Sequence, residues 1–171
     1  GFCVHAEIVF EGGAAWRWRP GATEASTPVA TWREVGFVDT QFTAAPAPFW
    51  YGDSYPGGTQ ISGMQNVYGC LFLRKTFVIT NVSEVESLQL GAIVDDGFAA
   101  WINGTEVQRV NVPGAAGSPV TISTLAGNAA EPVSFATYEL FSPASYLGAG
   151  TNVMGVQVFQ SSQNSSDLGF D

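Results

Sequence analysis

The sequence is poor in positive charge. It contains six Lys and Arg residues against fifteen Asp and Glu, a formal net charge of −9, and Lys75 is its only lysine. An acidic surface repels phosphate backbones and anionic headgroups, so we expect no nucleic-acid partner and no binding to membrane surfaces. No stretch approaches the ~20 consecutive apolar residues of a membrane-spanning helix, so we also expect no membrane insertion.

Catalytic residue types are scarce as well. The single histidine is His5, so no Ser-His-Asp or Cys-His arrangement can form elsewhere in the chain. Asp95 and Asp96 are adjacent and should point apart on a turn, whereas glycoside hydrolysis needs two carboxylates that face each other across a bond. We therefore expect no catalysis in this domain.

There are two cysteines, Cys3 and Cys70, and no zinc-type cluster of Cys and His. The two thiols could form one disulfide in an oxidising compartment. Alternatively, Cys70 is a small buried hydrophobe, because it lies in the apolar run YGCLFLR.

The first residues have two interpretations. Val4-His5-Ala6 resembles the cleavage end of a secretory signal peptide, which would make residues 1–6 a remnant and Glu7 the mature start. The alternative is an ordinary first strand, VHAEIVF. We expect residues 7–171 to form one domain, truncated within a strand that begins at Leu168. An acidic, lysine-poor composition is typical of secreted bacterial proteins, so we expect a secreted, extracellular or cell-surface location.

Glycine, proline and aromatic residues are plentiful. With 46% hydrophobic residues, 13% aromatic residues, 20 Gly and 9 Pro, the composition suits an all-β protein with many turns. The stretch Ser87–Asn111 organises the chain, because it contains the turns Asp95-Asp96-Gly97 and Asn103-Gly104 between apolar segments. It predicts two consecutive hairpins. We expect an all-β antiparallel sandwich of the jelly-roll type.

Other segments predict further strands and one long loop. The strand predictions are Glu7–Phe10, Ala14–Arg19, Asn66–Ile79, Val120–Leu125, Val133–Leu140 and Thr151–Gln160. In Ala14–Arg19, alternation places Trp16 and Trp18 on one sheet face, and Trp32 should plug the space under a polar loop. Phe49–Gly63 predicts a long aromatic, Gly-rich loop, and loops of this length are usually functional or packed by their own side chains.

Two groups of residues are candidates for ligand binding. Exposed Trp50, Tyr51 and Tyr55 in the aromatic loop would suit a carbohydrate, because sugar rings stack on aromatic faces; the alternative is that they pack internally. Around the acidic turn, a calcium site would use Asp95, Asp96 and Asp167, and a sugar would be held by Asn103, Arg109 and Asn111. The alternative is that the acidic residues accept backbone N–H bonds and that Arg109 ties to an acidic residue.

An ordered set of motifs extends over nearly the whole chain. They are WRW at 16–18, FLRKTF at 72–77, VDDG at 94–97, ING at 102–104, RVNVP at 109–113, GTNVMGVQV at 150–158 and SSDLGFD at 165–171. In this order they resemble the galactose-binding-like jelly-roll domains, similar to carbohydrate-binding modules, of secreted multidomain bacterial proteins. One departure is Val158-Phe159-Gln160, where relatives often carry His before Gln.

The resemblance implies the fold and an extracellular setting, and our first functional hypothesis is a non-catalytic carbohydrate-binding accessory module. Its partners would be a polysaccharide or glycan and other domains of the same polypeptide, with calcium as the one expected cofactor. A structural or adhesive module that contacts proteins is the alternative, and a domain of a polysaccharide-active hydrolase is a third, because this fold serves all three roles.

Overall fold

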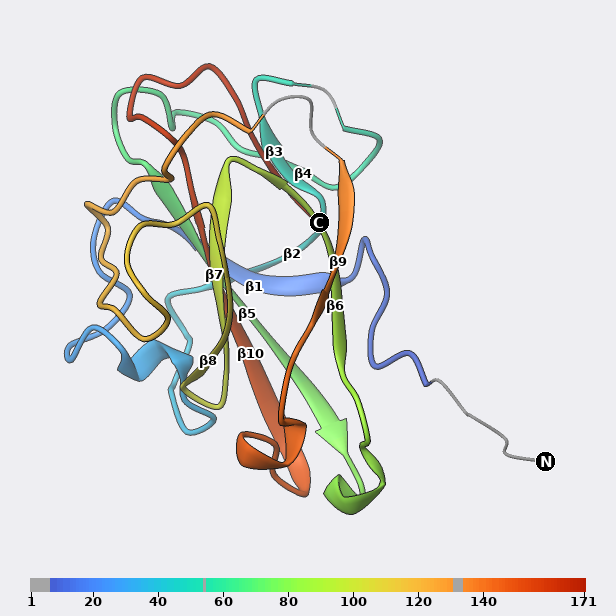
Figure 1. Ribbon diagram of the computed structural model, residues 1–171. Coiled ribbons are helices and arrows are strands. Elements are labelled where there is room, and N and C mark those ends of the chain that lie inside the picture. Colours follow the sequence, from blue (N-terminus) through green and yellow to red (C-terminus); the bar gives the residue numbers. More distant parts are fainter. Residues whose placement is uncertain (1–6, 54, 131–133) are drawn as a thin grey trace.

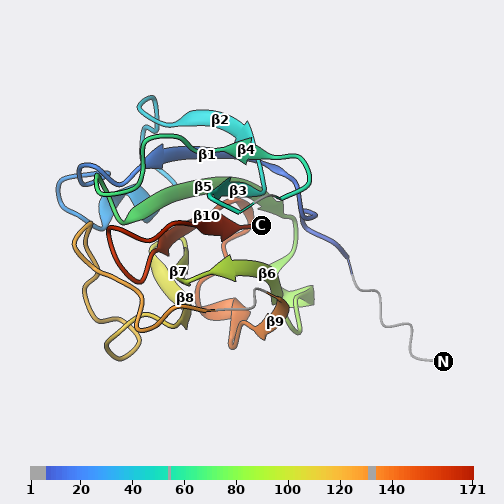
Figure 2. The same ribbon diagram turned by 90° about the horizontal axis from the view of Figure 1, so that it is seen from above.

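The computed structural model describes residues 7–53, 55–130 and 134–171. Within these ranges the chain forms eleven strands, β1 to β11, and three short helical turns, η1 (Thr31–Arg33), η2 (Val82–Glu84) and η3 (Pro143–Ser145). None of the helices in this part of the chain is long and apolar enough to cross a membrane. The strands make two sheets that face each other, as Figure 1 and Figure 2 show.

The larger sheet has six antiparallel strands. Their order is β2 (Thr43–Pro46), β1 (Ala15–Pro20), β5 (Cys70–Ile79), β10 (Gly150–Phe159), β7 (Gly97–Ile102) and β8 (Thr105–Val110). The central strands β5 and β10 pair over ten residues each. Pro46 lies on the edge strand β2, where the missing N–H of proline costs no ladder bond.

The smaller sheet has five strands. Their order is β4 (Thr59–Gln60), β3 (Phe49–Tyr51), β11 (Leu168–Phe170), β6 (Gln89–Asp95) and β9 (Phe135–Glu139). All neighbours are antiparallel except β3 and β4, which are parallel. The expected all-β sandwich of the jelly-roll type is confirmed.

The stretch Ser87–Asn111, which contains both predicted turns, connects the two sheets. Asn103 and Gly104 take the positive φ values of 51° and 86° in the predicted hairpin turn between β7 and β8. The predicted hairpin at Asp95-Asp96-Gly97 is wrong, because β6 and β7 belong to different sheets and Asp96 carries the chain from one to the other. The reason lies in β7, whose six residues are all buried and therefore need an interior place in the larger sheet.

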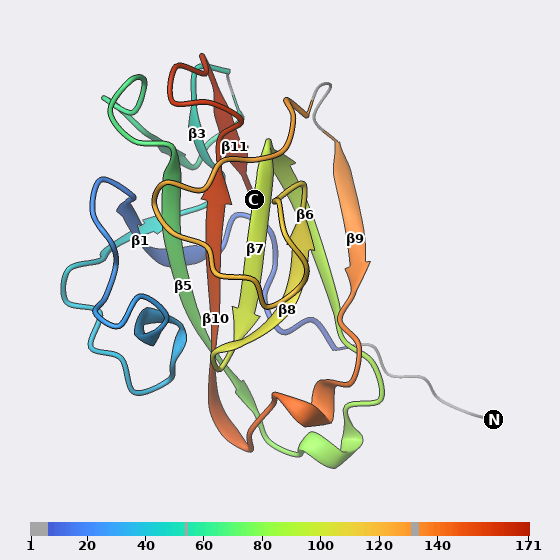
Figure 3. The ribbon, with the colours of Figure 1, turned by 60° about the vertical axis from the view of Figure 1, so that its left-hand side comes forward.

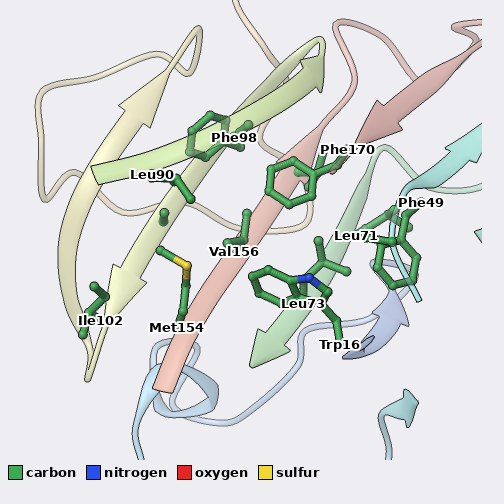
Figure 4. Close-up of a cluster of buried hydrophobic side chains, with 14 of the residues drawn as sticks. Trp16, Phe49, Leu71, Leu73, Leu90, Phe98, Ile102, Met154, Val156 and Phe170 are labelled. Atoms are coloured by element: carbon green, nitrogen blue, oxygen red, sulfur yellow. The ribbon is translucent and has the colours of Figure 1, made fainter. Parts of the chain in front are cut away.

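The main core lies between the sheets. Figure 4 shows side chains from both sheets pointing toward one another, among them Trp16, Phe49, Leu73, Leu90, Phe98, Met154 and Phe170. Trp18 packs against the same core, so the prediction that both indoles of β1 share one face is confirmed.

A second apolar cluster covers the outer face of the larger sheet. Phe72, Trp101 and Phe159 of that sheet lie beneath loop side chains that include Trp32, Phe42 and Val120. Trp32 is 0% exposed, so its predicted role as a plug is confirmed. Much of the larger sheet is therefore covered on both faces, although Thr76 and Val78 at the far end of β5 remain exposed on the outer side.

Three of the expected segments differ from the structure. Residues 7–10 and 120–125 form no strand: the Phe10 ring instead packs edge-on against Trp16, with centroids 5.7 Å apart, and Val120 is buried in a loop. The expected long loop at residues 49–63 contains β3 and β4. Residues 1–6 lie outside the described ranges, and with them the signal-peptide prediction.

Candidate functional site

The smaller sheet has one open face. Along β6, Leu90 and Ala92 point into the core, whereas Gln89, Gly91 and Ile93 alternate with them and point outward. Figure 3 shows β6 and β9 side by side, and the paired outward residues Phe135 and Thr137 of β9 are exposed. Among the described residues no second apolar cluster forms on this side, in contrast to the larger sheet. We call this surface the outer face.

Phe135 is the most exposed aromatic side chain of the outer face. It remains 66% exposed and pairs with Ile93 across the β9–β6 ladder. Its ring reaches over Gly91, where the ring carbon Cζ lies 2.6 Å from the position that a Cβ atom would occupy. The glycine thus leaves room for the ring to rest on the sheet rather than stand in solvent.

Trp50 and Tyr55 lie at the other side of the outer face. Phe49 of β3 is buried in the core, so Trp50, the next residue, points outward, and its indole Nε1 donates to the Gly57 carbonyl at 2.9 Å. Trp50 pairs with Gly169 of β11, and the Tyr55 hydroxyl lies against that glycine. Trp50 and Tyr55 are therefore both placed at the β3 side of the outer face.

Asp95 lies in the same row as these aromatic residues. Gly169 pairs with Trp50 on one side and with Asp95 on the other, so the three residues cross three neighbouring strands. Asp95 is only 1% exposed, although its position in β6 is on the outward side. The acidic residue is therefore part of the floor of the outer face rather than of its surface.

Tyr51 points to the opposite side from Trp50. It packs against the core, and its hydroxyl donates to the Ser165 carbonyl. Burial, and then the nearby charge of Asp167, raise the pKa of Tyr51. Asp167 accepts hydrogen bonds from Ser165 Oγ at 3.2 Å and Ser166 Oγ at 3.4 Å. Tyr51 thus ties β3 to the turn before β11.

Asp96 and Asn111 join three loops. The two carboxylate oxygens of Asp96 accept the backbone N–H groups of Ala130 at 2.9 Å and Ser161 at 2.6 Å. Asn111 donates through Nδ2 to the Asp96 carbonyl at 3.0 Å and to the Asn128 carbonyl at 2.7 Å. The peptide bond between Asp95 and Asp96 is cis. Both side chains are thereby engaged with the backbone.

Arg109 is engaged in a side-chain pair on β8. Its Nε and Nη2 each lie 2.8 Å from an oxygen of Glu106, and the two side chains are 7% and 8% exposed. It also donates to the carbonyls of Pro113 and Ser118. The hydrogen bond with Glu106 raises the pKa of Arg109.

Asn103 is engaged at the opposite end of the same hairpin. Its Nδ2 donates to Asn152 Oδ1 at 2.7 Å and to the Tyr146 carbonyl, and its Oδ1 accepts from the Val153 N–H. Asn103 and Arg109 belong to the larger sheet, so the structure does not bring them together with Trp50 or Tyr55.

The sequence predicts a calcium site at the acidic turn and offers a disulfide as one role for Cys70. Within the described ranges, no group of three or more His, Cys, Asp or Glu side chains is arranged to hold a metal ion. Calcium binding at Asp95, Asp96 and Asp167, which could also draw on backbone carbonyls, stays a prediction. Cys70 is a buried free thiol whose pKa is raised to about 12 by burial. Its proposed disulfide partner, Cys3, lies outside the described residues.

One aromatic residue of the outer face was not singled out from the sequence. Alternation across residues 133–140 puts Phe135, Thr137 and Glu139 on one face of a strand, and this signal was available. It did not reveal which face is solvated, because that depends on the sheet in which the strand lies.

Several solved structures share this fold. A β-glucuronidase from an uncultured Clostridium sp. matches with a TM-score of 0.53 and 15% identity, over 92% of this chain and 23% of that one. The β-glucuronidase of Bifidobacterium dentium, complexed with coumarin-3-O-glucuronide, matches with a TM-score of 0.51 and 17% identity, over 89% of this chain and 20% of that one. A calcium binding mutant of Bacteroides uniformis β-glucuronidase 2 matches with a TM-score of 0.51 and 14% identity, over 92% and 17%.

These similarities concern the fold. The chain spans about a fifth of the length of the β-glucuronidases that it matches. No protein-family model matches the sequence, and comparison with curated proteins yields no match. The chain therefore has a β-sandwich fold that also occurs as one part of larger glycoside hydrolases.

Proposed function

We propose that this protein is a non-catalytic carbohydrate-binding module and that the outer face, with Trp50, Tyr55 and Phe135, binds the glycan. The observation that carries the proposal is the contrast between the two sheets: loops cover much of the outer face of the larger sheet, while that of the smaller sheet carries the exposed ring of Phe135 and the half-buried Trp50 and Tyr55. Sugar rings expose apolar C–H faces, which gain contact area against such rings.

The spacing of the aromatic residues suits an oligosaccharide rather than a single sugar. Trp50 lies on β3 and Phe135 on β9, with β11 and β6 between them. At the usual separation of neighbouring strands, the two rings stand on the order of 15 Å apart. Polar side chains lie farther along the same two strands: Gln89 donates to Glu139 at 3.1 Å, and both point outward, four residues along the ladder from the Ile93–Phe135 pair. They offer hydrogen-bonding partners for sugar hydroxyl groups.

The proposed accessory role within a larger protein is supported by the share of the matched structures that this fold occupies. The matched β-glucuronidases are enzymes in which a fold of this kind occupies about a fifth of the chain. We propose a similar place here, beside other domains of a secreted, carbohydrate-active polypeptide at the cell surface or outside the cell. Fold similarity alone does not assign a reaction, so the proposal rests on the outer face.

The test is binding of the isolated protein to immobilised polysaccharides. Affinity electrophoresis in gels that contain neutral and acidic polysaccharides, with calcium or with EDTA, should show retarded migration on at least one of them. Unchanged migration on every polysaccharide under both conditions would contradict the proposal. An adhesive module would give that negative result and would instead bind a protein through the same exposed rings.

A further inference from the structure

Strand β9 is an unprotected edge of the smaller sheet. It pairs with β6 on one side, and no described strand lies beyond it in Figure 2 or Figure 3. The other edge strands carry features that usually block pairing with a further strand: β2 contains Pro46, β4 is two residues long, and β8 carries the Glu106–Arg109 ion pair. The sequence of β9, FATYE, contains neither proline nor lysine.

Alternate residues of β9 direct their backbone groups toward β6. Directly beyond the paired residues of the two strands, the Leu140 N–H donates to the Leu88 carbonyl at 2.8 Å. Hydrogen-bonded and non-hydrogen-bonded pairs alternate along an antiparallel ladder. Tyr138 and Ala136, two and four residues before Leu140, therefore also direct their N–H and carbonyl groups to β6.

The residues between them direct their backbone groups to the uncovered edge. Ile93, the ladder partner of Phe135, bonds through both its N–H and its carbonyl to Asp171, on the other side of β6 from β9. The pair is therefore of the non-hydrogen-bonded kind, and the alternation extends this to Thr137 and Glu139. The edge thus presents the N–H and carbonyl groups of these three residues of β9 in a row.

We propose that this edge of β9 pairs with the same edge of a second copy of the chain, which gives a two-fold symmetric dimer. The row is self-complementary: in an antiparallel arrangement centred on Thr137, Phe135 lies opposite Glu139 of the second copy, and Glu139 lies opposite its Phe135. Each outward N–H group then meets a carbonyl. This register pairs all of β9, and no like charges are opposite each other.

The dimer joins two smaller sheets into one continuous sheet. The two-fold axis of an antiparallel strand pair is perpendicular to the sheet, so the outer faces of both copies lie on the same side. Side chains stand perpendicular to the strands, and Phe135 therefore stays on the outer face. Each chain has a net charge of −9, so salt should strengthen the association by screening the repulsion.

This dimer goes beyond the proposed function and does not depend on it. The experiment is sedimentation equilibrium of the full chain at rising concentration. A Cys3→Ser background excludes disulfide-linked dimers, because Cys70 is a buried thiol. Thr137→Pro removes an edge N–H without removing a bond to β6, and Thr137→Lys places two like charges opposite each other. Thr43→Lys is the matched control, because Thr43 is an exposed threonine on β2, an edge strand of the larger sheet.

The mass of the Cys3→Ser protein should rise with concentration from 18.1 kDa to twice that value, and should do so more readily at physiological than at low salt. Thr137→Pro should abolish the dimer, and Thr137→Lys should raise its dissociation constant by about tenfold or more, with Thr43→Lys unchanged. If Thr137→Pro lowers the melting temperature, Thr137→Lys decides. A monomer at every concentration up to about 1 mM, or an equal effect of Thr43→Lys, would overturn the proposal.

A cysteine substitution tests the register directly. In a hydrogen-bonded antiparallel pair the Cα atoms lie about 5.5 Å apart, within the range of a disulfide. In the Cys3→Ser background, Thr137→Cys should therefore form a disulfide-linked dimer in air, seen on a non-reducing gel. In Ser134→Cys, an exposed neighbour, the two positions lie about 20 Å apart, and no dimer should form. No cross-link at position 137, or equal cross-linking at both, would overturn the proposal and leave polysaccharide binding by the outer face unaffected.

Discussion

The ring of Phe135 lies over Gly91, with its Cζ atom 2.6 Å from the position that a side-chain Cβ would occupy. The two residues sit on neighbouring strands of the smaller sheet, β9 and β6. This contact lets a 66% exposed aromatic ring rest on the sheet, which gives the outer face its flat aromatic surface. The position of Phe135, a proposed binding residue, therefore depends on the absence of a side chain at Gly91.

Substitution of that glycine should move the ring without unfolding the protein. In Gly91→Ala the new Cβ would contact the far edge of an exposed ring, which can rotate into solvent. We expect the free energy of unfolding to change by no more than about 0.5 kcal/mol, while affinity for the glycan falls. Urea unfolding and affinity electrophoresis of the same variant measure the two effects. A loss of several kcal/mol would show that Phe135 is fixed more rigidly than its exposure indicates.

Asp96 should be important for stability. Its carboxylate, only 3% exposed, accepts two backbone N–H groups from different loops, so Asp96→Ala leaves two partly buried donors without their partner. We expect a loss of about 3 kcal/mol in the free energy of unfolding, and a smaller loss for Asp96→Asn. The exposed residue Asp53 provides the control, because Asp53→Ala removes the same charge from a surface position.

The same two variants test the calcium prediction. If the acidic turn binds calcium, adding it to the EDTA-treated wild type should raise the melting temperature, and Asp96→Ala should lose that increase while Asp53→Ala keeps it. If calcium leaves the melting temperature unchanged in all three proteins, the calcium prediction is wrong, and the role of Asp96 is limited to its hydrogen bonds with Ala130 and Ser161.

Substitution of Arg109 should lower the stability of the fold without weakening glycan binding. It forms a buried, two-point pair with Glu106, so Arg109→Ala leaves the Glu106 carboxylate without its main partner. We expect a loss of about 3–5 kcal/mol, measured by urea unfolding, and unchanged glycan affinity for the fraction that remains folded. Weaker glycan binding in a variant of unchanged stability would instead place Arg109 in the binding site.

Alkaline pH should destabilise the fold through Cys70. Burial raises its pKa to about 12, from 9.0 in an exposed thiol, so the unfolded chain loses this proton first as the pH rises. The contribution to stability is present below pH 9 and is lost between pH 9 and 12. Tyr146, whose pKa burial raises to about 12, acts in the same direction. In a Cys3→Ser background, the free energy of unfolding should fall less steeply over this range in Cys70→Ala.

Much of the fold could be predicted from local patterns. Asn103-Gly104 specified a tight turn because few other residue pairs accept two positive φ values, and Trp16 and Trp18 indicated a shared face by their spacing. Asp95-Asp96-Gly97 predicted a turn correctly and its type wrongly. The local sequence marks a change of direction, but the sheet that each strand joins is decided by long-range pairing with β10 and β11.

The candidate site depended on tertiary structure to a greater degree. Trp50 and Tyr51 are adjacent aromatic residues, and the sequence alone did not show which of them is exposed. Trp50 points outward and Tyr51 points inward because of the register in which β3 pairs with β11. Phe135 is a candidate binding residue only because β9 is an edge strand with one solvated face, which the sequence alone did not show. Arg17 and Arg74 lie 57 positions apart in sequence, and only the pairing of β1 with β5 places them opposite each other.

The central claim is that the aromatic rings of the outer face bind a glycan. Its most direct test is the dissociation constant of the polysaccharide that retards the wild type, measured for Trp50→Ala, Phe135→Ala and Phe141→Ala. Phe141 is the control, because it is an equally bulky ring, 80% exposed, that lies beyond the end of β9. We expect Trp50→Ala and Phe135→Ala each to weaken binding by about fivefold or more, with melting temperatures close to that of the wild type, and Phe141→Ala to bind normally. Wild-type affinity in both outer-face variants, or an equal loss in Phe141→Ala, would contradict the account.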